Sequence, residues 1–541
     1  MNYISYAYGQ NHFECDRDLS VILSSYWTDF PNHKQALHEF GAYAGREVYE
    51  AVYHVDHDAW PILIAHDLDG RRVDRVLLSP AERMVLKELA KINRPPYEGG
   101  SWHHHYAMGY LIGDPGLYCI LTITGQTAYA IHKYAPEYDD LKGKLLSGEA
   151  YGATWMTEVQ GGSDLGANQT VAKQIGGTWR LTGDKYFASG AGLTDYAITT
   201  ARIDGAKQGP KGLSLFLLPR LNTDGNLNFH VRRLKDKSAT RAVPSGEVEL
   251  QNSEAILVGN QAEGIYYTME NLTVSRLANA IGAMGIAKKA HLEVLERVLR
   301  RNTFGKPLVN HPLIRRDLTD LAVRMAGGLT LAFHAIDAFD KSWHERSPYS
   351  EAYNYARFLS HLAKNRTAEH SAQITAMAME LFGGLGFLEE YAIARWHREA
   401  LITPIWEGPS NIQTLDFLET MKKYNAHETF LAQIVPLLKS AETEEGAKAV
   451  ILLKDAFSQL EKMSFEEAQW YGKEILLRIA DLTQVALLYR LAQLGFSRYE
   501  KLASLYFHRF VLHEEYSNSA MNDEDVWGGV ADARTYYPSV T

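Results

Sequence analysis

The stretch that decides the fold is "ELFGGLGFLEEYAIARWHRE", residues 380–399, in which a helical pattern ends at a double glycine and a second apolar segment follows. Taken alone, the double glycine fits an ordinary helix C-terminus, because glycine readily adopts the left-handed conformation found there. A second stretch, "WMTEVQGGSDLGA" at residues 155–167, offers small and hydroxyl residues whose backbone N–H groups could hold an anion, although an ordinary loop has the same composition. The two stretches together are more informative than either one alone.

The segments between and around these stretches differ in their pattern of apolar residues. Residues 178–259 carry short β-rich runs separated by turn residues, whereas residues 33–150 and the chain after residue 264 have mostly helical periodicity. Three long amphipathic helices that could form an antiparallel bundle are predicted at 277–299, 313–339 and 354–382, with further helices from about 430 to 515. We therefore predict four consecutive domains, at residues 1–150 (helical), 151–262 (β), 263–425 (helical bundle) and 426–541 (helical extension).

Length and composition limit the classes of protein to which the chain can belong. With 541 residues, 46% of them hydrophobic, the chain can bury a large core spread over several domains. Its only cysteines, Cys15 and Cys119, exclude a disulfide framework and a zinc site built from cysteine pairs, which is typical of an intracellular protein. Because residues 1–18 show no export signal and no run of eighteen apolar residues exists, we expect a cytoplasmic protein without membrane spans.

Several common catalytic signatures are absent. The chain contains no GxGxxG, GxxxxGK[ST], HExxH or GxSxG, so no Rossmann phosphate turn, P-loop, simple zinc protease or serine hydrolase is indicated. The one local histidine cluster is "WHHHY", with His103, His104 and His105. Consecutive residues on a helix point in different directions, so we expect a partly exposed helix face there and no metal site.

Residues 155–167 and 380–399 together resemble the two signatures of the acyl-CoA dehydrogenase family, the first with Trp155 where a small residue is usual. Three shorter stretches extend the resemblance: "GDKYFASG" at 183–190, "RRNTFGKPL" at 300–308 and "IWEGPSNI" at 405–412. Within the family the chain is most similar to the AidB-like branch, through "DGRRVDRVLLSPAE", "RRLKDKSATRA" and "WEGPSNIQTLD". The resemblance implies a mainly helical α+β fold: an N-terminal helical domain, a central β-barrel-like domain, a helical bundle and an extra C-terminal helical segment.

The resemblance also implies an activity and its cofactor. In this family FAD takes a hydride at its N5 atom from the β-carbon of an acyl-CoA thioester while a carboxylate removes the α-proton, so the chain would be an oxidoreductase acting on CH-CH groups. Glu407 matches the loop that carries this base, and Ser275, at the family's alternative position beside Arg276, cannot act as one. The base requires a position against the α-carbon, and fixed donors must stabilise the enolate-like oxygen.

The family pattern assigns further roles residue by residue. Thr157 and Ser163 would hydrogen-bond the flavin, Phe187 would cover a ring face, Ser189 would contact the N5 edge and Arg301 would reach the diphosphate bound by a neighbouring subunit. Glu380 stands where many relatives have glutamine and is left out of the site, since a carboxylate would meet a diphosphate poorly. The predicted cofactor-binding residues are Met156, Thr157, Gly162, Ser163, Phe187, Ala188, Ser189, Arg301, Phe304, Gly384, Ile405, Trp406, Gly408 and Asn411. The predicted substrate-binding residues are Ser163 and Arg276.

Two opposing effects act on the expected base. Ile405 and Trp406 would supply apolar cover, and burial raises the pKa of a glutamate toward neutrality. A helix beginning at Pro409 would present its positive end to the same carboxylate, which lowers its pKa, and to a flavin, where it favours the negative charge of the reduced state. The sequence leaves open which effect is larger. Glu407 as a simple helix N-terminal carboxylate is the structural alternative.

The AidB-like branch implies a rival function, a flavoprotein with a DNA-binding role in protection against alkylation and with little turnover. In that branch DNA binding is linked to a basic C-terminal region, but residues 421–541 here carry 13 lysines and arginines against 17 aspartates and glutamates, a net charge of −4. We therefore expect no sub-micromolar binding to duplex DNA in a low-salt shift assay. The expected partners are an acyl-CoA substrate, an acceptor such as electron-transfer flavoprotein, and three further copies in a homotetramer. A helical scaffold without flavin is the remaining alternative.

Overall fold

The computed structural model describes residues 4–527 and divides into two compact units. The bundle unit comprises Met1–Arg46, Ser101–Gly113 and Asn279–Thr541, and the barrel unit comprises Glu47–Gly100 and Asp114–Ala278. Helix α8 (Gly264–Arg300) begins in the barrel unit and ends in the bundle unit. Both units are assembled from separated stretches of sequence, so the division into four consecutive domains stays a prediction. Residues 528–541 of the predicted fourth domain lie outside the described residues.

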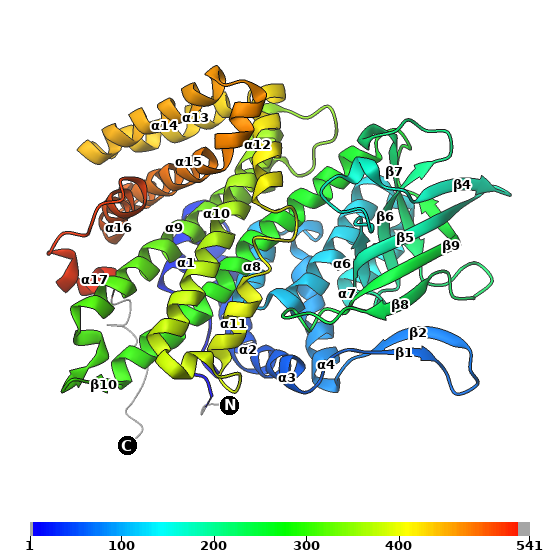
Figure 1. Ribbon diagram of the computed structural model, residues 1–541, viewed down its shortest axis with the longest axis horizontal. Coiled ribbons are helices and arrows are strands. Elements are labelled where there is room, and N and C mark those ends of the chain that lie inside the picture. The colour runs from blue at the N-terminus through cyan, green and yellow to red at the C-terminus, as the bar shows by residue number, and fades with distance from the viewer. Residues whose placement is uncertain (1–3, 528–541) are drawn as a thin grey trace. The chain divides into compact units, whose positions relative to one another are not determined.

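The barrel unit is built on a closed β-barrel (Figure 1). Strands pair in the order β6–β4–β5–β9–β7, and β7 pairs with β6 again, which closes five strands into a ring and leaves no free edge among them. Trp155, Leu181, Phe216 and Val248 belong to the buried core of this barrel. The strands are β3 Gly152–Trp155, β4 Val171–Ile175, β5 Thr178–Ser189, β6 Tyr196–Ile203, β7 Leu213–Pro219, β8 His230–Leu234 and β9 Ser245–Leu257. The β-rich runs predicted from the sequence are thus confirmed.

A two-stranded hairpin that the sequence analysis did not predict precedes the barrel. Strands β1 (Ile62–His66) and β2 (Arg72–Leu77) pair antiparallel within the segment expected to be mostly helical. One face of the hairpin packs on the barrel: Leu63 contacts its core, and the Val76 N–H donates to the Gly192 carbonyl at 2.9 Å. The alternating apolar residues and an Asp-Gly turn are the signals that could have revealed it.

Four helices complete the part of the barrel unit that precedes α8. They are α3 Tyr49–His57, α4 Pro80–Leu89, α6 Pro115–Tyr134 and α7 Asp139–Ser147. Ser79 caps α4, since its hydroxyl accepts a hydrogen bond from the Glu82 N–H at 3.1 Å. The Glu82 side chain is buried, and neither of its carboxylate oxygens has a hydrogen-bond partner. Burial, together with the nearby Asp114 carboxylate, raises the pKa of Glu82 to about 8.

We expect Glu82 to make stability depend on pH. An ordinary glutamate pKa lies near 4.5, so between that value and about 8 the unfolded chain releases the Glu82 proton while the folded protein keeps it. The free energy of unfolding therefore falls as pH rises through this window and levels off above it. Denaturant unfolding at pH 5, 7 and 9 measures the slope, and a Glu82→Gln variant should flatten it. An unchanged slope in that variant would contradict the assignment.

The three long helices expected from the sequence are present, α9 and α10 within the bundle unit and α8 with only its later part there. Their observed bounds are α8 Gly264–Arg300, α9 Pro312–Ser342 and α10 Glu351–Phe382, and α9 packs along α10. A small hairpin, β10 (Asn302–Thr303) and β11 (Lys306–Pro307), connects α8 to α9. The remaining helices are α1 Arg17–Tyr26, α2 Phe30–Tyr43, α5 Trp102–Ile112, α11 Ala392–Ala400, α12 Ser410–Tyr424, α13 Ala426–Lys439, α14 Glu444–Lys462, α15 Phe465–Gln493, α16 Arg498–Tyr506 and α17 Glu524–Trp527.

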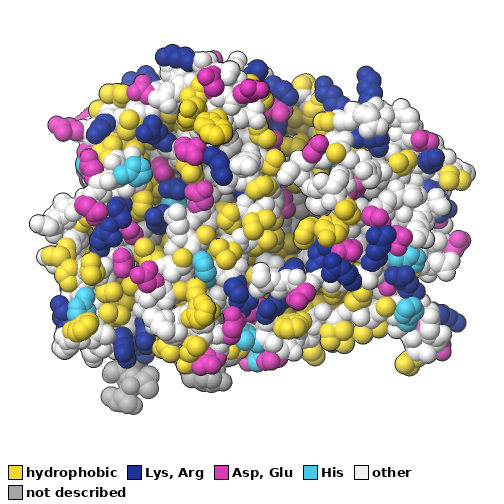
Figure 2. Space-filling model, in the orientation of Figure 1, with side chains coloured by type: hydrophobic (Ala, Val, Ile, Leu, Met, Phe, Trp, Pro, Cys, Tyr) yellow, Lys and Arg dark blue, Asp and Glu magenta, His cyan; other side chains and the backbone are white. Residues whose placement is uncertain are grey.

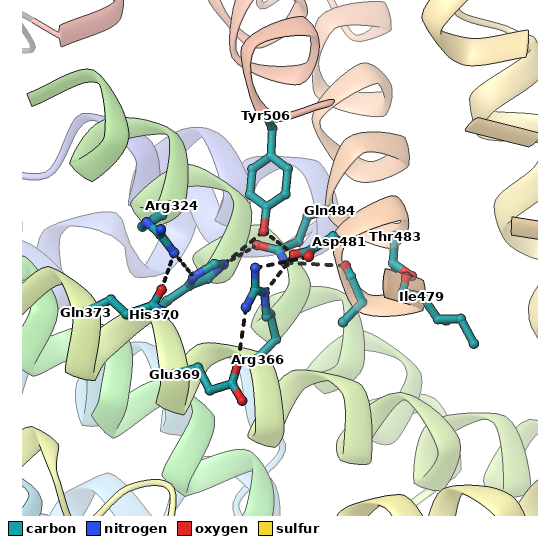
Figure 3. Close-up of polar contacts among 11 residues, drawn as sticks. Arg324, Arg366, Glu369, His370, Gln373, Ile479, Asp481, Thr483, Gln484 and Tyr506 are labelled. Atoms are coloured by element: carbon teal, nitrogen blue, oxygen red, sulfur yellow. Dashed lines mark hydrogen bonds and ion pairs between the residues drawn. The ribbon is translucent and has the colours of Figure 1, made fainter. Parts of the chain in front are cut away.

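A buried polar network attaches the C-terminal helices to α10 (Figure 3). Arg366 on α10 donates to both carboxylate oxygens of Asp481 on α15, from Nε at 2.6 Å and from Nη2 at 3.0 Å. The Tyr506 hydroxyl of α16 donates to Asp481 at 2.6 Å and lies 3.0 Å from Nε2 of His370. Burial disfavours the charged guanidinium, but the Asp481 carboxylate outweighs it and raises the pKa of Arg366. The predicted C-terminal helical extension is therefore packed on the bundle through charges as well as apolar side chains.

The described residues include no membrane-spanning helix, and the face drawn in Figure 2 carries both signs of charge. Within residues 4–527, no helix combines the length and the apolar character that crossing a membrane requires. On the face drawn in Figure 2, basic and acidic side chains are interspersed.

Candidate functional site

The predicted site residues fall into two groups, one in each unit. The barrel group comprises Met156, Thr157, Gly162, Ser163, Phe187, Ala188, Ser189 and Arg276. The bundle group comprises Arg301, Phe304, Gly384, Ile405, Trp406, Glu407, Gly408 and Asn411. Within each unit the structure brings several of these residues together from separate segments.

The loop after β3 lies along the last residues of β5. The Tyr186 N–H donates to the Thr157 carbonyl at 3.0 Å, and the Trp155 indole N–H donates to the Ser189 carbonyl at 2.8 Å. These two bonds place Thr157 beside the segment that contains Phe187, Ala188 and Ser189. The Trp155 side chain is buried in the barrel core, which accounts for a large residue at a place where the family usually has a small one.

This part of the barrel offers hydroxyl groups and an exposed aromatic ring to a ligand. A Cβ added at Gly162 would lie 2.5 Å from the Thr157 hydroxyl oxygen, so only glycine lets this hydroxyl pack against the loop backbone. Thr157 and Ser189 are half-buried, and Ser163 is exposed, so these hydroxyls can meet a ligand. The Phe187 side chain is 57% exposed, although it lies on a barrel strand. An exposed aromatic ring beside hydroxyl donors fits the ring system of FAD.

A buried ion pair holds this loop to the barrel. Lys185 Nζ lies 2.9 Å from Glu158 Oε1, and the same carboxylate accepts from the Thr170 hydroxyl at 2.6 Å and from the Gln169 N–H at 2.6 Å. Burial works against the charged carboxylate, but Lys185 and these donors outweigh it and lower the pKa of Glu158. The sequence analysis missed this pair, which fixes the neighbours of Thr157 and Phe187.

In the bundle unit, Glu407 lies in a tight loop just before α12. Its φ is +58°, in the left-handed region that glycine favours, and φ of the following Gly408 is +92°. A Cβ at Gly408 would lie 2.8 Å from Nε2 of Gln413, so glycine is required for this approach. Helix α12 begins at Ser410 with Pro409 as its N-cap, one residue later than predicted. A non-glycine residue held in this conformation is typical of functional sites.

Buried side chains from two helices hold the Glu407 loop. Lys364 on α10 donates through Nζ to the Gly408 carbonyl at 2.7 Å and to the Pro404 carbonyl at 3.2 Å. Gln413 on α12 donates to the carbonyls of Glu407 and Gly408, both at 2.9 Å, and its own amide oxygen lies 3.0 Å from Nδ1 of His361. The sequence analysis missed these residues. Lys364 stands among other polar and charged residues of α10, such as Asn365 and Arg366, so its sequence context gives no signal of this role.

We expect Lys364→Met to loosen this loop. The substitution removes the donor shared by two carbonyls on either side of Glu407, so the carboxylate loses its fixed position. With Glu407 as the base and FAD as the cofactor that the resemblance implies, we expect a fall in kcat of about 10- to 100-fold with FAD still bound, because misplacement of a catalytic group by about 1 Å can cost about 100-fold in rate. Steady-state kinetics and the visible spectrum of the variant measure the two quantities. A kcat equal to that of the parent would contradict this role.

The other members of the bundle group are surface residues. Phe304 is 97% exposed at the tip of the β10–β11 hairpin, and Arg301 beside it is exposed as well. Gly384 follows the end of α10, and a Cβ there would meet nothing within 4 Å. Ile405 is 61% exposed, whereas Trp406 is half-buried and its indole N–H donates to Asn279. An exposed arginine suits a diphosphate group.

The histidine cluster differs from its prediction. His103 and His105 are buried, not on a partly exposed face, because α5 packs against α9 within the bundle unit. His103 lies 3.4 Å from Asp337 and 3.7 Å from Asp340, both on α9. The apolar residues that follow the cluster on α5, Tyr106 to Ile112, are the sequence signal that could have revealed this burial. Among the described residues, no group of three or more histidine, cysteine or acidic side chains could hold a metal ion.

Comparisons with known proteins agree with this architecture. Residues 2–152 match the adaptive response protein AidB N-terminal domain, residues 153–253 the acyl-CoA dehydrogenase middle domain and residues 262–422 the acyl-CoA dehydrogenase C-terminal domain. The putative acyl-CoA dehydrogenase AidB of Escherichia coli (strain K12) is 30% identical over 390 residues, which are 67% of this chain and 69% of that protein.

Two solved structures share the fold over most of their length. The apo form of Bd2924 superposes with a TM-score of 0.79 at 29% identity, covering 90% of this chain and 98% of that one. The Caenorhabditis elegans protein ACDH-11 in complex with C11-CoA gives a TM-score of 0.81 at 24% identity, covering 98% and 96%. A mainly helical protein with a closed five-stranded barrel of this topology has the acyl-CoA dehydrogenase fold. The chain belongs to the acyl-CoA dehydrogenase family, and its N-terminal part is of the AidB type.

Proposed function

We propose that this protein is an FAD-dependent acyl-CoA dehydrogenase that oxidises the Cα–Cβ bond of an acyl-CoA thioester. The observation that carries the proposal is the loop of Glu407, a left-handed turn just before a helix, whose backbone carbonyls are held by Lys364 and Gln413. The family is FAD-dependent, and hydroxyls, an exposed aromatic ring and an exposed arginine among the predicted residues suit the parts of that cofactor. When bound, FAD supplies the acceptor for the hydride.

The chain's own residues then act on the substrate. Glu407 removes the α-proton through its carboxylate and becomes protonated. Its backbone N–H stabilises the thioester oxygen as negative charge develops there. Ser163 and Arg276 contact the substrate.

The remaining assignments belong to the same proposal. The protein acts in the cytoplasm as a homotetramer, in which Arg301 reaches the diphosphate bound by a neighbouring subunit. The electron acceptor is a protein such as electron-transfer flavoprotein. The substrate range is open, and acyl chains from butyryl upward are the class to examine.

An anaerobic titration of the purified protein tests the proposal. Butyryl-, isovaleryl- and longer acyl-CoA thioesters are added while the visible band of the bound flavin is followed. Rapid bleaching by one of them would support a dehydrogenase and define its substrates. A flavin band that no thioester bleaches would contradict turnover and favour the rival, an AidB-like flavoprotein with a binding role. Absence of any bound flavin would reject both functions.

A further inference from the structure

The ammonium of Lys235 lies over two aromatic rings of β5. Its Nζ is 3.4 Å from the ring centroid of Tyr186 and 4.7 Å from that of Phe187. Lys235 follows β8, and its side chain is only 8% exposed. Nζ also donates to Glu247 Oε1 at 2.9 Å, and the Lys235 N–H donates to the Ser245 carbonyl at 2.7 Å. A partly desolvated lysine whose backbone and ammonium are both hydrogen-bonded interacts strongly with a ring face.

A β-bulge produces this arrangement. Along β5 and β9, Lys185 pairs with Val248 and Ala188 with Gly246, so Tyr186 and Phe187 together face the single residue Glu247. A bulge of this kind re-aims side chains and is frequent beside functional sites. Here Glu247 both faces the bulge and binds Lys235. The outward turn of Phe187 and the position of the lysine are therefore parts of one local structure.

Two cations share one carboxylate beside the ring. Glu247 Oε1 binds Lys235 and also accepts from Arg233 Nη2 at 2.7 Å, so one carboxylate is shared by two cations. One face of the Phe187 ring lies under Lys235, while the side chain stays 57% exposed. The opposite face is the one that a flat ligand can reach.

We propose that Lys235 is a positioning residue of the flavin site, which fixes the Phe187 ring and places a positive charge beside the bound cofactor. The inference rests on the proposed function, because it needs a flavin against Phe187. Reduction of a flavin accumulates negative charge on its ring system, and a nearby cation in a poorly solvated place favours the charged form. Lys235 thereby favours the reduced over the oxidised cofactor.

The test compares Lys235→Met with Lys235→Arg, which keeps the charge, in the full-length protein. A matched control is Lys173→Met on β4, which removes an exposed lysine paired with Asp204 in the same unit. Quenching of FAD fluorescence gives the dissociation constant, and reduction against a reference dye gives the two-electron midpoint potential. For Lys235→Met we expect about threefold weaker binding. We also expect the ratio of oxidised to reduced flavin at a fixed potential to rise about tenfold, which corresponds to a midpoint potential lower by about 30 mV. Lys235→Arg and Lys173→Met should keep the parent potential.

The outcomes separate the inference from the proposed function. A Lys235→Met variant that binds FAD with the parent's midpoint potential overturns the inference. A Lys235→Arg variant whose potential shifts as much as that of Lys235→Met also overturns it, because the change in packing and not the charge would then be the cause. A parent protein that does not quench FAD fluorescence overturns the proposed function and the inference with it. Arg233 still pairs Glu247 in Lys235→Met, so we expect folding. If the melting temperature falls nevertheless, Lys235→Gln, which retains a donor for Glu247, makes the same comparison.

Discussion

Glu407→Gln is expected to lower the rate of flavin reduction by acyl-CoA thioesters by about 10²- to 10⁴-fold, the range for loss of a general base. Glutamine keeps the length of the side chain and can occupy the same left-handed backbone conformation, but it cannot accept the α-proton. Anaerobic stopped-flow measurement of bleaching under saturating thioester gives the rate directly. The visible spectrum before mixing reports whether FAD remains bound.

A carboxylate elsewhere on α12 provides the control for this experiment. Glu419 pairs with Lys423 on the solvent-facing side of the helix, 2.8 Å away, and Glu419→Gln should keep the parent rate. If Glu407→Gln retains a tenth or more of the parent's rate with flavin bound, another group removes the proton. The proposed role of the Glu407 loop would then be wrong, even if the protein is a dehydrogenase.

Asp481→Ala is expected to lower the free energy of unfolding by about 3–5 kcal/mol, the usual cost of removing one partner from a buried ion pair. The substitution removes both Asp481 bonds of the buried Arg366 guanidinium, which keeps only a bond to the partly exposed Glu369, and it deprives the Tyr506 hydroxyl of its acceptor. Denaturant unfolding followed by circular dichroism measures the loss. Flavin content should change little at low temperature, since none of these residues belongs to the predicted site.

Two comparisons make this prediction specific. Glu419→Ala breaks an exposed ion pair and should cost at most about 1 kcal/mol. A double variant, Arg366→Met with Asp481→Leu, removes both charges and fills their volume with apolar atoms, so it should be more stable than Asp481→Ala alone. A double variant as unstable as the single one would show that the uncompensated charge is not the cause of the loss.

The features that the sequence predicted well are those with local causes. The long helices of the bundle follow from periodic apolar residues and from breaks such as Pro312 and Gly383, and both observed boundaries fall at these residues. The strands of the barrel are recognisable because turn residues separate short apolar runs. The family and the loop of Glu407 follow from short motifs, in which a few adjacent residues carry the signal.

The features that the sequence did not predict depend on residues far apart in the chain. Lys185 and Glu158 are 27 residues apart, and Arg366 and Asp481 are 115 apart. In the sequence each of them looks like an ordinary solvated charge, because only the folded barrel or bundle removes it from water. The same holds for Lys364, whose role depends on a loop supplied 40 and 44 residues later.

Hydrogen bonds join helix α1, near the N-terminus, to helices α15 and α16. These contacts bear on the order in which the two units can fold during synthesis. Asp18 accepts from Arg498 at 2.6 Å and the Ser25 carbonyl accepts from Arg490 at 2.7 Å, although these partners are 480 and 465 residues apart. The barrel unit ends at Ala278 and can close while the rest of the chain is still on the ribosome. The bundle unit has to wait until residue 498 has emerged, with the apolar face of α1 incompletely covered in the meantime. We therefore expect the bundle unit to fold after the barrel unit. While the bundle is incomplete, its exposed apolar side chains are the surface that a chaperone would bind.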